Sequence, residues 1–281
     1  MIKIVETPRD GIQGIKEFIP TDLKIDYINS LLNVGFDTVE VGSFVSIESI
    51  PQLSDTEEVL NSLDLTDSKS KLMVLAANVK GAKTASSFEN IDYILYPFSA
   101  SESFLKRNIN SNFDKSKKTI EEFQNISTKQ NKELVVYITM GFGNPYGDKW
   151  HPEIICKWVE FLKNLEIGII PLSDITGEST PEKITAVYSL LNKEFTDIEF
   201  GFHLHTDKKS WNEKVDAAYQ NGCRRFDTVL GGMGGCPMTG YELLANLDTF
   251  DLLDYCTENN IETKLDKSKL EEAKVISSKM S

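Results

Sequence analysis

Residues 169–205, IIPLSDITGESTPEKITAVYSLLNKEFTDIEFGFHLH, contain two short apolar runs separated by one amphipathic stretch. The runs 169–172 and 199–203 have the length and composition of buried strands. A helix opens between them at Thr180-Pro181-Glu182, because proline is well tolerated at the first helical position. The order of strand, helix and strand predicts a unit of a parallel sheet.

The same alternation extends through the rest of the chain. One of the intervening helices, 21–34, has readable ends, because Thr21 can cap its first turn and Gly35 can take the left-handed conformation after its last. Eight repeats of strand and helix favour closure into a (β/α)8 TIM barrel, since closure removes both exposed sheet edges. An open doubly wound sheet is the alternative. The eight predicted strands are 2–6, 38–41, 72–76, 93–96, 134–139, 169–172, 199–203 and 226–230.

The length of the chain suits a single domain. Its 281 residues lie near the length of an ordinary barrel, which is about 250 residues, so we expect residues 1–281 to form one α/β domain. The charged run 264–274 predicts an additional C-terminal surface helix. Residues 277–281 are expected to form a frayed tail.

Composition restricts the classes of partner and the compartment. Asp plus Glu total 43 against 30 Lys plus Arg, and the net charge of -13 disfavours nucleic acid and anionic membranes as partners. No apolar run approaches the roughly 18 to 20 residues of a membrane-spanning helix, and no signal or transit peptide is visible. The four cysteines form no C-x-x-C pair, which suits a reducing compartment. We therefore expect a cytoplasmic protein, and the sequence leaves a homodimer open.

Side chains capable of chemistry gather where the predicted strands end. In a barrel the loops that follow the strands meet at one face and build the site. Five different strands deliver polar groups to that face, namely Arg9, Asp10 and Gln13; Glu40 and Ser43; Ser173 and Asp174; His203 and His205; and the run 231–237.

The pair His203-x-His205 is the sharpest of these signals. The chain has only three histidines, and two residues that lie two apart on a strand point to the same face. A hydrogen-bonded histidine pair without a metal is an equal reading of this doublet alone. Asp10 favours a metal, because a carboxylate supplies the oxygen ligand that two neutral imidazoles need to hold a divalent ion.

The glycines at 231–235 precede Cys236 and Pro237. They lack the G-x-G-x-x-G order of a dinucleotide site, so we interpret them as a mobile lid that carries Cys236 to the barrel mouth. A single cysteine is more often inert than catalytic, and Cys156 and Cys223 lie beside apolar neighbours as core residues do.

Taken together, these motifs resemble hydroxymethylglutaryl-CoA lyase. They stand in the order of that family and span nearly the whole chain. The Arg-Asp-Gly-x-Gln and His-x-His motifs are shared with a wider group of metal-dependent barrel lyases and Claisen-type synthases, whereas Gly-Gly-Cys-Pro is more specific to the lyase. The motifs are Pro8-Arg9-Asp10-Gly11-Ile12-Gln13, Ser43-Phe44-Val45-Ser46 with Pro51-Gln52, Ser101-Glu102 through Asn108-Ile109-Asn110, His203-x-His205 and Gly234-Gly235-Cys236-Pro237.

The resemblance implies a retro-Claisen cleavage of 3-hydroxy-3-methylglutaryl-CoA to acetoacetate and acetyl-CoA, and with it a place in leucine degradation and ketone-body metabolism. Arg9 would face the thioester carbonyl, and Asp10 would accept the proton of the C3 hydroxyl with His203 as a relay. Cys236 would lie on the active-site loop. The implied metal ligands are Asp10, His203, His205 and Asn246, and the implied supporting residues are Glu40, Asp174 and Tyr137, beside Gln13 and Ser43.

The ligand types and the substrate lead to two further expectations. Carboxylate, amide and imidazole ligands with open positions suit Mg²⁺ or Mn²⁺ more than zinc, because no thiolate is among them. CoA carries phosphates, which require a local basic patch on a chain of this net charge. Lys16, Lys106 and Arg107, expected on loops after the first and fourth strands, are the candidates, and an ordinary solvated surface is the alternative for them.

The chain also departs from the family, and three other functions compete. Met238 and Ala245 stand where the family usually has tyrosine and glycine, and the stretch from Cys236 to Asn246 is one residue longer. A condensing synthase of the isopropylmalate, homocitrate or citramalate type would carry Gly-Glu-Arg-x-Gly-Asn in place of Gly235-Cys236-Pro237. A 4-hydroxy-2-oxoacid aldolase and a non-catalytic binding protein are the other rivals.

Overall fold

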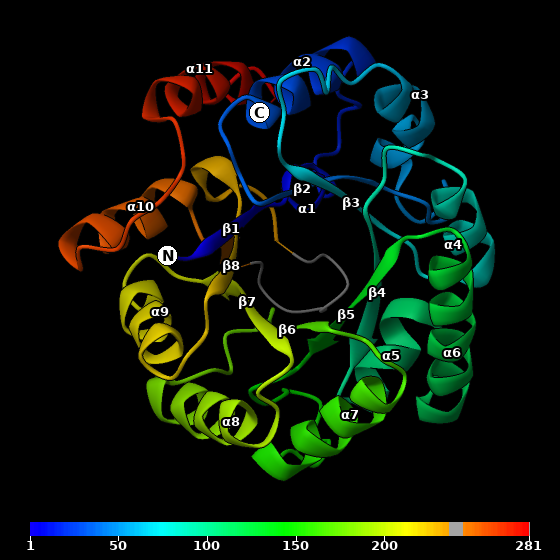
Figure 1. Cartoon of the computed structure of the whole chain (residues 1–281), viewed down its shortest axis with the longest axis vertical. Coiled ribbons are helices and arrows are strands. Elements are labelled where there is room, and N and C mark those ends of the chain that lie inside the picture. Colours follow the sequence, from blue (N-terminus) through cyan, green and yellow to red (C-terminus); the bar gives the residue numbers. More distant parts are fainter. Residues whose placement is uncertain (236–243, 281) are drawn as a thin grey trace.

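A computed structural model describes residues 1–235 and 244–280, and eight parallel strands form a closed ring within them. Each strand pairs with the next along the chain, and β8 pairs with β1 to complete the ring. Figure 1 looks down this ring and shows the helices around it. The chain is therefore a (β/α)8 barrel. The strands are β1 Lys3–Glu6, β2 Thr38–Ser43, β3 Lys71–Leu75, β4 Tyr93–Ser99, β5 Glu133–Thr139, β6 Ile169–Asp174, β7 Glu199–Thr206 and β8 Arg225–Thr228.

The outer layer consists of helices that follow the strands. The last of them, α11, packs against α2 and brings the end of the chain beside its first long helix (Figure 1). No helix of the described residues is both long and apolar enough to cross a membrane. The α-helices are α1 Pro8–Ile12, α2 Thr21–Leu32, α3 Thr56–Asn61, α4 Val79–Ser86, α5 Glu102–Ile109, α6 Phe113–Lys129, α7 Pro152–Asn164, α8 Pro181–Glu194, α9 Trp211–Gln220, α10 Thr249–Glu258 and α11 Lys267–Ser277.

A short strand, β9 (Ala245–Asn246), runs antiparallel to the end of β7. In this pairing Asn246 lies opposite His205, and the backbone N–H of Leu247 donates to the carbonyl of Leu204 at 3.0 Å. The chain beyond the glycine-rich segment is thereby returned to the carboxyl end of the barrel.

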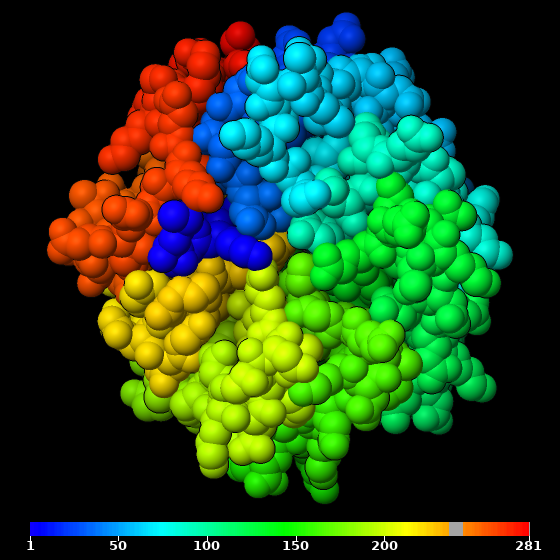
Figure 2. Space-filling view, viewed as in Figure 1, coloured from blue at the N-terminus to red at the C-terminus, as the bar shows by residue number. Residues whose placement is uncertain are grey.

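The two ends of the barrel differ in chemistry. At the amino ends of the strands the buried Arg225 donates from Nη1 to Asp37 Oδ2 at 3.2 Å and to Glu199 Oε1 at 3.1 Å. Figure 2 shows the face on which the chain begins, with its first residues (blue) near the middle of that face. Ion pairs therefore close the amino end, and the carboxyl end is left for a site, as in other barrels of this kind.

Each predicted strand overlaps an observed one, and most helix signals are confirmed. Gly35 follows α2 with φ +95°, and Thr180 accepts the N–H of Lys183 at the start of α8. The end predicted for the seventh strand is wrong, because β7 continues to Thr206 and so contains both histidines.

Three other predictions need correction. Thr21 does not cap α2, because it is the first helical residue and its hydroxyl donates to Asp55 at 2.9 Å. The C-terminal helix runs from Lys267 to Ser277, three residues later at each end than the predicted 264–274. The expected frayed tail is also wrong as far as residue 280, since Met280 is only 5% exposed. Ser281 lies outside the described residues.

Candidate active site

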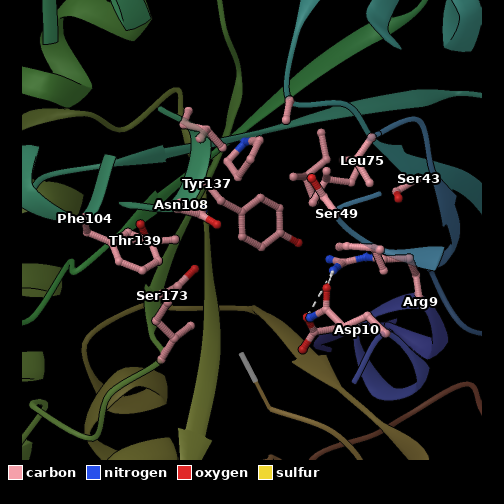
Figure 3. A pocket seen from close by; sticks show the side chains of 18 of the residues that line it. Arg9, Asp10, Ser43, Ser49, Leu75, Phe104, Asn108, Tyr137, Thr139 and Ser173 are labelled. Atoms are coloured by element: carbon pink, nitrogen blue, oxygen red, sulfur yellow. Dashed lines mark hydrogen bonds and ion pairs between the residues drawn. The ribbon is translucent and has the colours of Figure 1, made fainter. Parts of the chain in front are cut away.

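A cavity of about 400 Å³ lies at the carboxyl ends of the strands. Arg9 and Asp10 line one side of it, Phe104 and Thr139 line the opposite side, and the ring of Tyr137 lies between them (Figure 3). Most of the polar residues expected at the strand ends border this one space, including Gln13, Glu40, Ser43, Ser173, His203 and His205.

Arg9 and Asp10 reach the cavity because α1 begins directly after β1. Pro8 occupies the first turn of this helix and fixes its start. Arg9 Nη1 donates to Asp10 Oδ1 at 3.1 Å, and Gln13 Nε2 donates to the same oxygen at 2.5 Å. Two donors therefore hold one oxygen of Asp10, while Oδ2 faces the histidines.

Glu40 of β2 holds the other side of the Arg9 guanidinium. Arg9 Nε donates to Glu40 Oε1 at 2.8 Å, and Nη2 lies 2.7 Å from the same oxygen. Burial raises the pKa of Glu40 to about 7, although the positive charge of Arg9 opposes the shift. The guanidinium is thus fixed between two buried carboxyl groups, with Glu40 only 1% exposed.

His203 and His205 lie on the same face of β7, as their spacing predicts, and both are buried. Their Nε2 atoms lie 2.9 Å apart. Asp10 Oδ2 lies 3.9 Å from Nε2 of His203 and 3.5 Å from Nε2 of His205. Two imidazole nitrogens and one carboxylate oxygen therefore converge within 4.8 Å of one another, and these three residues can hold a metal ion.

The donor set fits a divalent cation. The 2.9 Å between the imidazole nitrogens alone is compatible with a mutual hydrogen bond, but two ligands of one ion at about 2.1 Å each would lie about as close. Asp10 supplies an anionic third ligand, and the positive charges around it hold its pKa well below the usual range although burial opposes this. An ionised carboxylate beside two imidazoles suits a hard or borderline metal.

Asn246 lies beside this triad. Its Nδ2 donates to Asp10 Oδ2 at 3.0 Å and to the carbonyl of Met233 at 2.9 Å. The oxygen and nitrogen of a side-chain amide are interchangeable by rotation, so the same residue can present its oxygen to a cation next to Asp10. The position suits the predicted role as a ligand.

Asp227 of β8 is a site residue that the sequence pattern did not reveal. Its Oδ2 accepts from Tyr137 Oη at 2.7 Å and lies within hydrogen-bond distance of His203 Nδ1, at 3.1 Å. Burial alone would lower the pKa of His203, but the carboxylates of Asp227 and Asp10 raise it. A signal was present, because Asp227 stands two residues after Arg225 within an apolar run, and both therefore point to the same face of the strand.

Ser43, Ser173 and Asp174 take different positions. The hydroxyls of Ser43 and Ser173 are buried at the cavity and have no hydrogen-bond partner in the described part of the chain. They are available to a bound molecule. Asp174 does not line the cavity, because its carboxylate accepts the backbone N–H groups of Gly177 and Ser179 and so orders the loop before α8.

The three basic residues proposed for the CoA phosphates do not form one patch at the cavity. Arg107 lines it, with its guanidinium 5.2 Å from the ring centre of Tyr146, whereas Lys16 and Lys106 are exposed and outside the lining. The expected loop position of Lys106 and Arg107 is wrong, because both lie in the last turn of α5. The helix begins soon after β4, where the hydroxyl of Ser101 caps its first turn by accepting the N–H of Phe104.

Cys236 lies outside the described residues, so its predicted position at the barrel mouth stays a prediction. Among the glycines just before it, Gly234 is required by the backbone conformation and by a close contact. Gly234 has φ +86°, and a Cβ atom there would come within 2.8 Å of the Asp10 carbonyl oxygen. The segment thus passes directly over Asp10. Cys223 is buried as expected, and burial raises its pKa to about 12, whereas Cys156 is only partly buried.

Comparison with known proteins agrees with this geometry. The family model HMGL-like matches residues 1–276. A cytoplasmic 3-hydroxy-3-methylglutaryl-CoA lyase of Rattus norvegicus is 30% identical over 273 residues, which cover 97% of this chain and 79% of the relative. A hydroxymethylglutaryl-CoA lyase of Bacillus subtilis is 29% identical over 274 residues, which cover 97% of this chain and 91% of the relative.

Solved structures give the same result. An HMG-CoA lyase from Acinetobacter baumannii, in complex with coenzyme A and 3-methylmalate, superposes with a TM-score of 0.92 at 30% identity and covers 100% of this chain and 91% of its own. An HMG-CoA lyase from Brucella melitensis has a TM-score of 0.91 at 29% identity, covering 99% and 98%. Matching family model, sequence relatives and folds together show that this chain belongs to the HMGL-like family.

Proposed function

We propose that this protein is a divalent-metal-dependent lyase that cleaves 3-hydroxy-3-methylglutaryl-CoA to acetoacetate and acetyl-CoA. The observation that carries the proposal is the meeting of Arg9 with the Asp10, His203 and His205 triad at one cavity of an HMGL-like barrel. The reaction needs a group that stabilises an alkoxide and a group that stabilises a thioester enolate. The cavity offers one candidate for each.

The triad is the proposed group that stabilises the alkoxide. Asp10, His203 and His205, with Asn246 beside them, would hold Mg²⁺ or Mn²⁺, since oxygen and imidazole ligands with open positions suit these ions. When bound, the cation would lower the pKa of the substrate's C3 hydroxyl and orient its distal carboxylate.

Asp10 is the proposed proton acceptor for that hydroxyl. Both of its oxygens are engaged, Oδ1 by Arg9 and Gln13 and Oδ2 by Asn246, so the incoming proton would replace one of these contacts. The proton must then leave Asp10. His203, whose Nε2 lies 3.9 Å from Asp10 Oδ2, is the proposed relay, and Nε2 would have to leave the metal before it accepts the proton.

Arg9 is the proposed group that stabilises the thioester enolate. Its guanidinium is buried, fixed by Glu40 and charged, because Glu40 and Asp10 raise its pKa although burial opposes them. A fixed cation needs no reorganisation when negative charge develops on the thioester oxygen, and removal of such a donor commonly costs about 3 to 4 kcal/mol in the barrier. Cys236 is proposed to protonate the enolate carbon or to exclude water.

The remaining assignments are part of the same proposal. An acyl-CoA substrate is supported by the Acinetobacter relative, whose structure contains coenzyme A. We propose Arg107 as the first contact for its phosphates, because it lines the cavity, with Lys16 and Lys106 as outer contacts. We also propose one domain spanning residues 1–281, a cytoplasmic location and a role in leucine degradation and ketone-body metabolism.

A substrate panel tests the reaction type. The purified protein with Mg²⁺ or Mn²⁺ would be offered 3-hydroxy-3-methylglutaryl-CoA, acetyl-CoA with each of several 2-oxoacids, and a 4-hydroxy-2-oxoacid, with products followed by mass spectrometry. Acetoacetate and acetyl-CoA from the first substrate alone support the lyase. Condensation products indicate a synthase, pyruvate from the last substrate indicates an aldolase, and no turnover in any mixture contradicts the proposal.

A further inference from the structure

Asp227 contacts His203 at Nδ1, the ring nitrogen that is not part of the metal triad, and Asp227 is not itself one of the triad's ligands. Its side chain is 2% exposed and projects from β8 into the barrel interior. One oxygen, Oδ2, accepts a hydrogen bond from Tyr137 Oη at 2.7 Å and lies 3.1 Å from His203 Nδ1. The other oxygen has no partner in the described part of the chain. Within the described residues, Oδ2 therefore makes all the hydrogen-bond contacts of this carboxylate, one with Tyr137 and one with His203.

The contact with His203 decides which ring nitrogen carries the proton. A neutral imidazole has one N–H and one lone pair, and a carboxylate oxygen that already accepts from Tyr137 has no hydrogen to donate to His203. His203 must therefore carry its proton on Nδ1, which leaves the lone pair on Nε2. That atom is the one that points to the centre of the triad, 2.9 Å from His205 Nε2 and 3.9 Å from Asp10 Oδ2.

We propose that Asp227, held in place by Tyr137, is a positioning residue that fixes His203 in the Nδ1–H tautomer and aims its Nε2 at the metal. The inference rests on the metal site of the proposed function. Removal of such a partner of a metal-binding histidine commonly costs 10- to 100-fold in metal affinity, roughly, because ring orientation and ligand basicity are lost together.

Tyr137 contacts both Asp227 and His203. Its hydroxyl donates to the same oxygen that accepts from His203, and its ring lies edge-on to the imidazole with centroids 6.0 Å apart. The tyrosine therefore restricts rotation of both the carboxylate and the ring. His205 has no equivalent support, because its Nδ1 lacks a partner among the described residues. Loss of Asp227 should accordingly change the tautomer of His203, and the tautomer of His205 should change with it in the metal-free protein, because the two Nε2 atoms lie 2.9 Å apart and share one hydrogen.

The chain is well suited to a direct measurement. It has only three histidines, and the third, His151, is exposed at the start of α7 and serves as an internal reference. Ring ¹⁵N chemical shifts of metal-free protein report the tautomer of each histidine, and electron paramagnetic resonance reports the Kd of Mn²⁺. The variants are Asp227→Leu, which removes the acceptor at similar size, Asp227→Asn, which keeps a neutral acceptor, and Tyr137→Phe, which removes only the second donor.

In the wild type His203 should be an Nδ1–H imidazole. Asp227→Leu should shift it towards the Nε2–H tautomer and weaken Mn²⁺ binding by about 10- to 100-fold, while Asp227→Asn and Tyr137→Phe should weaken it by about 3- to 10-fold. His151 should not change in any variant. If Asp227→Leu does not fold, the asparagine variant decides alone, because it preserves shape.

Two outcomes separate this inference from the proposed function. Wild-type tautomers together with wild-type Mn²⁺ affinity in both Asp227 variants overturn the positioning role. Failure of the wild type itself to bind Mn²⁺ contradicts the metal site, yet the tautomer of His203 in the metal-free protein would still test what Asp227 does. An Nε2–H tautomer in the wild type would also overturn the inference.

Discussion

Arg9→Met removes the buried guanidinium that pairs with both Glu40 and Asp10, and the structure predicts two separate consequences. For stability, the carboxyl group of Glu40, which is 1% exposed, loses the guanidinium that contacts it at 2.7 Å. Breaking a buried ion pair from one side commonly costs about 3 to 5 kcal/mol. For turnover, the enolate loses its fixed donor, so kcat should fall by roughly 10²- to 10³-fold.

The pH dependence of the first effect has a definite sign. The pKa of Glu40 is already raised to about 7 with Arg9 present, and loss of Arg9 must raise it further. The folded variant therefore binds a proton that the unfolded chain releases above pH 4.5, the ordinary pKa of the group. Its stability should be highest at acidic pH and should fall as pH rises from about 5 through 8.

A second substitution separates stability from catalysis. Arg9→Met with Glu40→Gln has no carboxylate at position 40 to leave unpaired, so its urea midpoint should recover towards the wild type and lose most of the pH dependence. Its kcat should stay as low as that of Arg9→Met. Glu40→Gln alone keeps the guanidinium and should lose less activity. Recovery of kcat in the double variant to within about threefold of the wild type would refute the electrostatic role of Arg9.

Three further predictions concern the triad, the glycine segment that passes over it, and the buried carboxyl group of Glu6. His205→Ala should abolish Mn²⁺ binding measured by electron paramagnetic resonance, with the melting temperature changed by only a few degrees, since the site lies at the barrel mouth; wild-type affinity would contradict its role as a ligand. Gly234→Ala places a Cβ 2.8 Å from the Asp10 carbonyl oxygen at φ +86°, which should strain the backbone there by about 1 to 3 kcal/mol. The variant should bind Mn²⁺ more weakly, with a smaller effect on the urea midpoint. Unchanged binding would count against the close approach. Burial raises the pKa of Glu6 to about 8 from 4.5, so the wild type should lose stability relative to Glu6→Gln as pH rises from 4.5 to 8, by at most about 5 kcal/mol; parallel denaturation midpoints across that range would disprove it.

The sequence predicted the barrel because its signals are local and periodic. Each strand is a short apolar run. The start of α8 at Thr180 and the end of α2 at Gly35 each depend on only one or two residues. The cap predicted at Thr21 failed for a tertiary reason, since its hydroxyl instead contacts Asp55, which lies 34 residues away. Local chemistry cannot show such a competing partner.

The candidate site was predictable where a residue's place on its strand fixes its direction. His203 and His205 meet Asp10 because all three stand at the carboxyl ends of strands that a closed ring brings together. Asp227 was not found, because its meaning depends on two partners from other strands. Lys106 was misplaced for a simpler reason, since the helix that contains it begins immediately after β4 and leaves almost no loop.

The most direct test is turnover of 3-hydroxy-3-methylglutaryl-CoA by the wild-type protein before and after removal of metal. Acetoacetate would be quantified for protein treated exhaustively with a chelator, for the same protein after addition of Mg²⁺ or Mn²⁺, and for His205→Ala under both conditions. We predict no acetoacetate without metal, restored turnover with either ion, and no restoration in the variant, because the triad has lost a ligand. Full turnover after chelation, or none with either ion, would contradict the account.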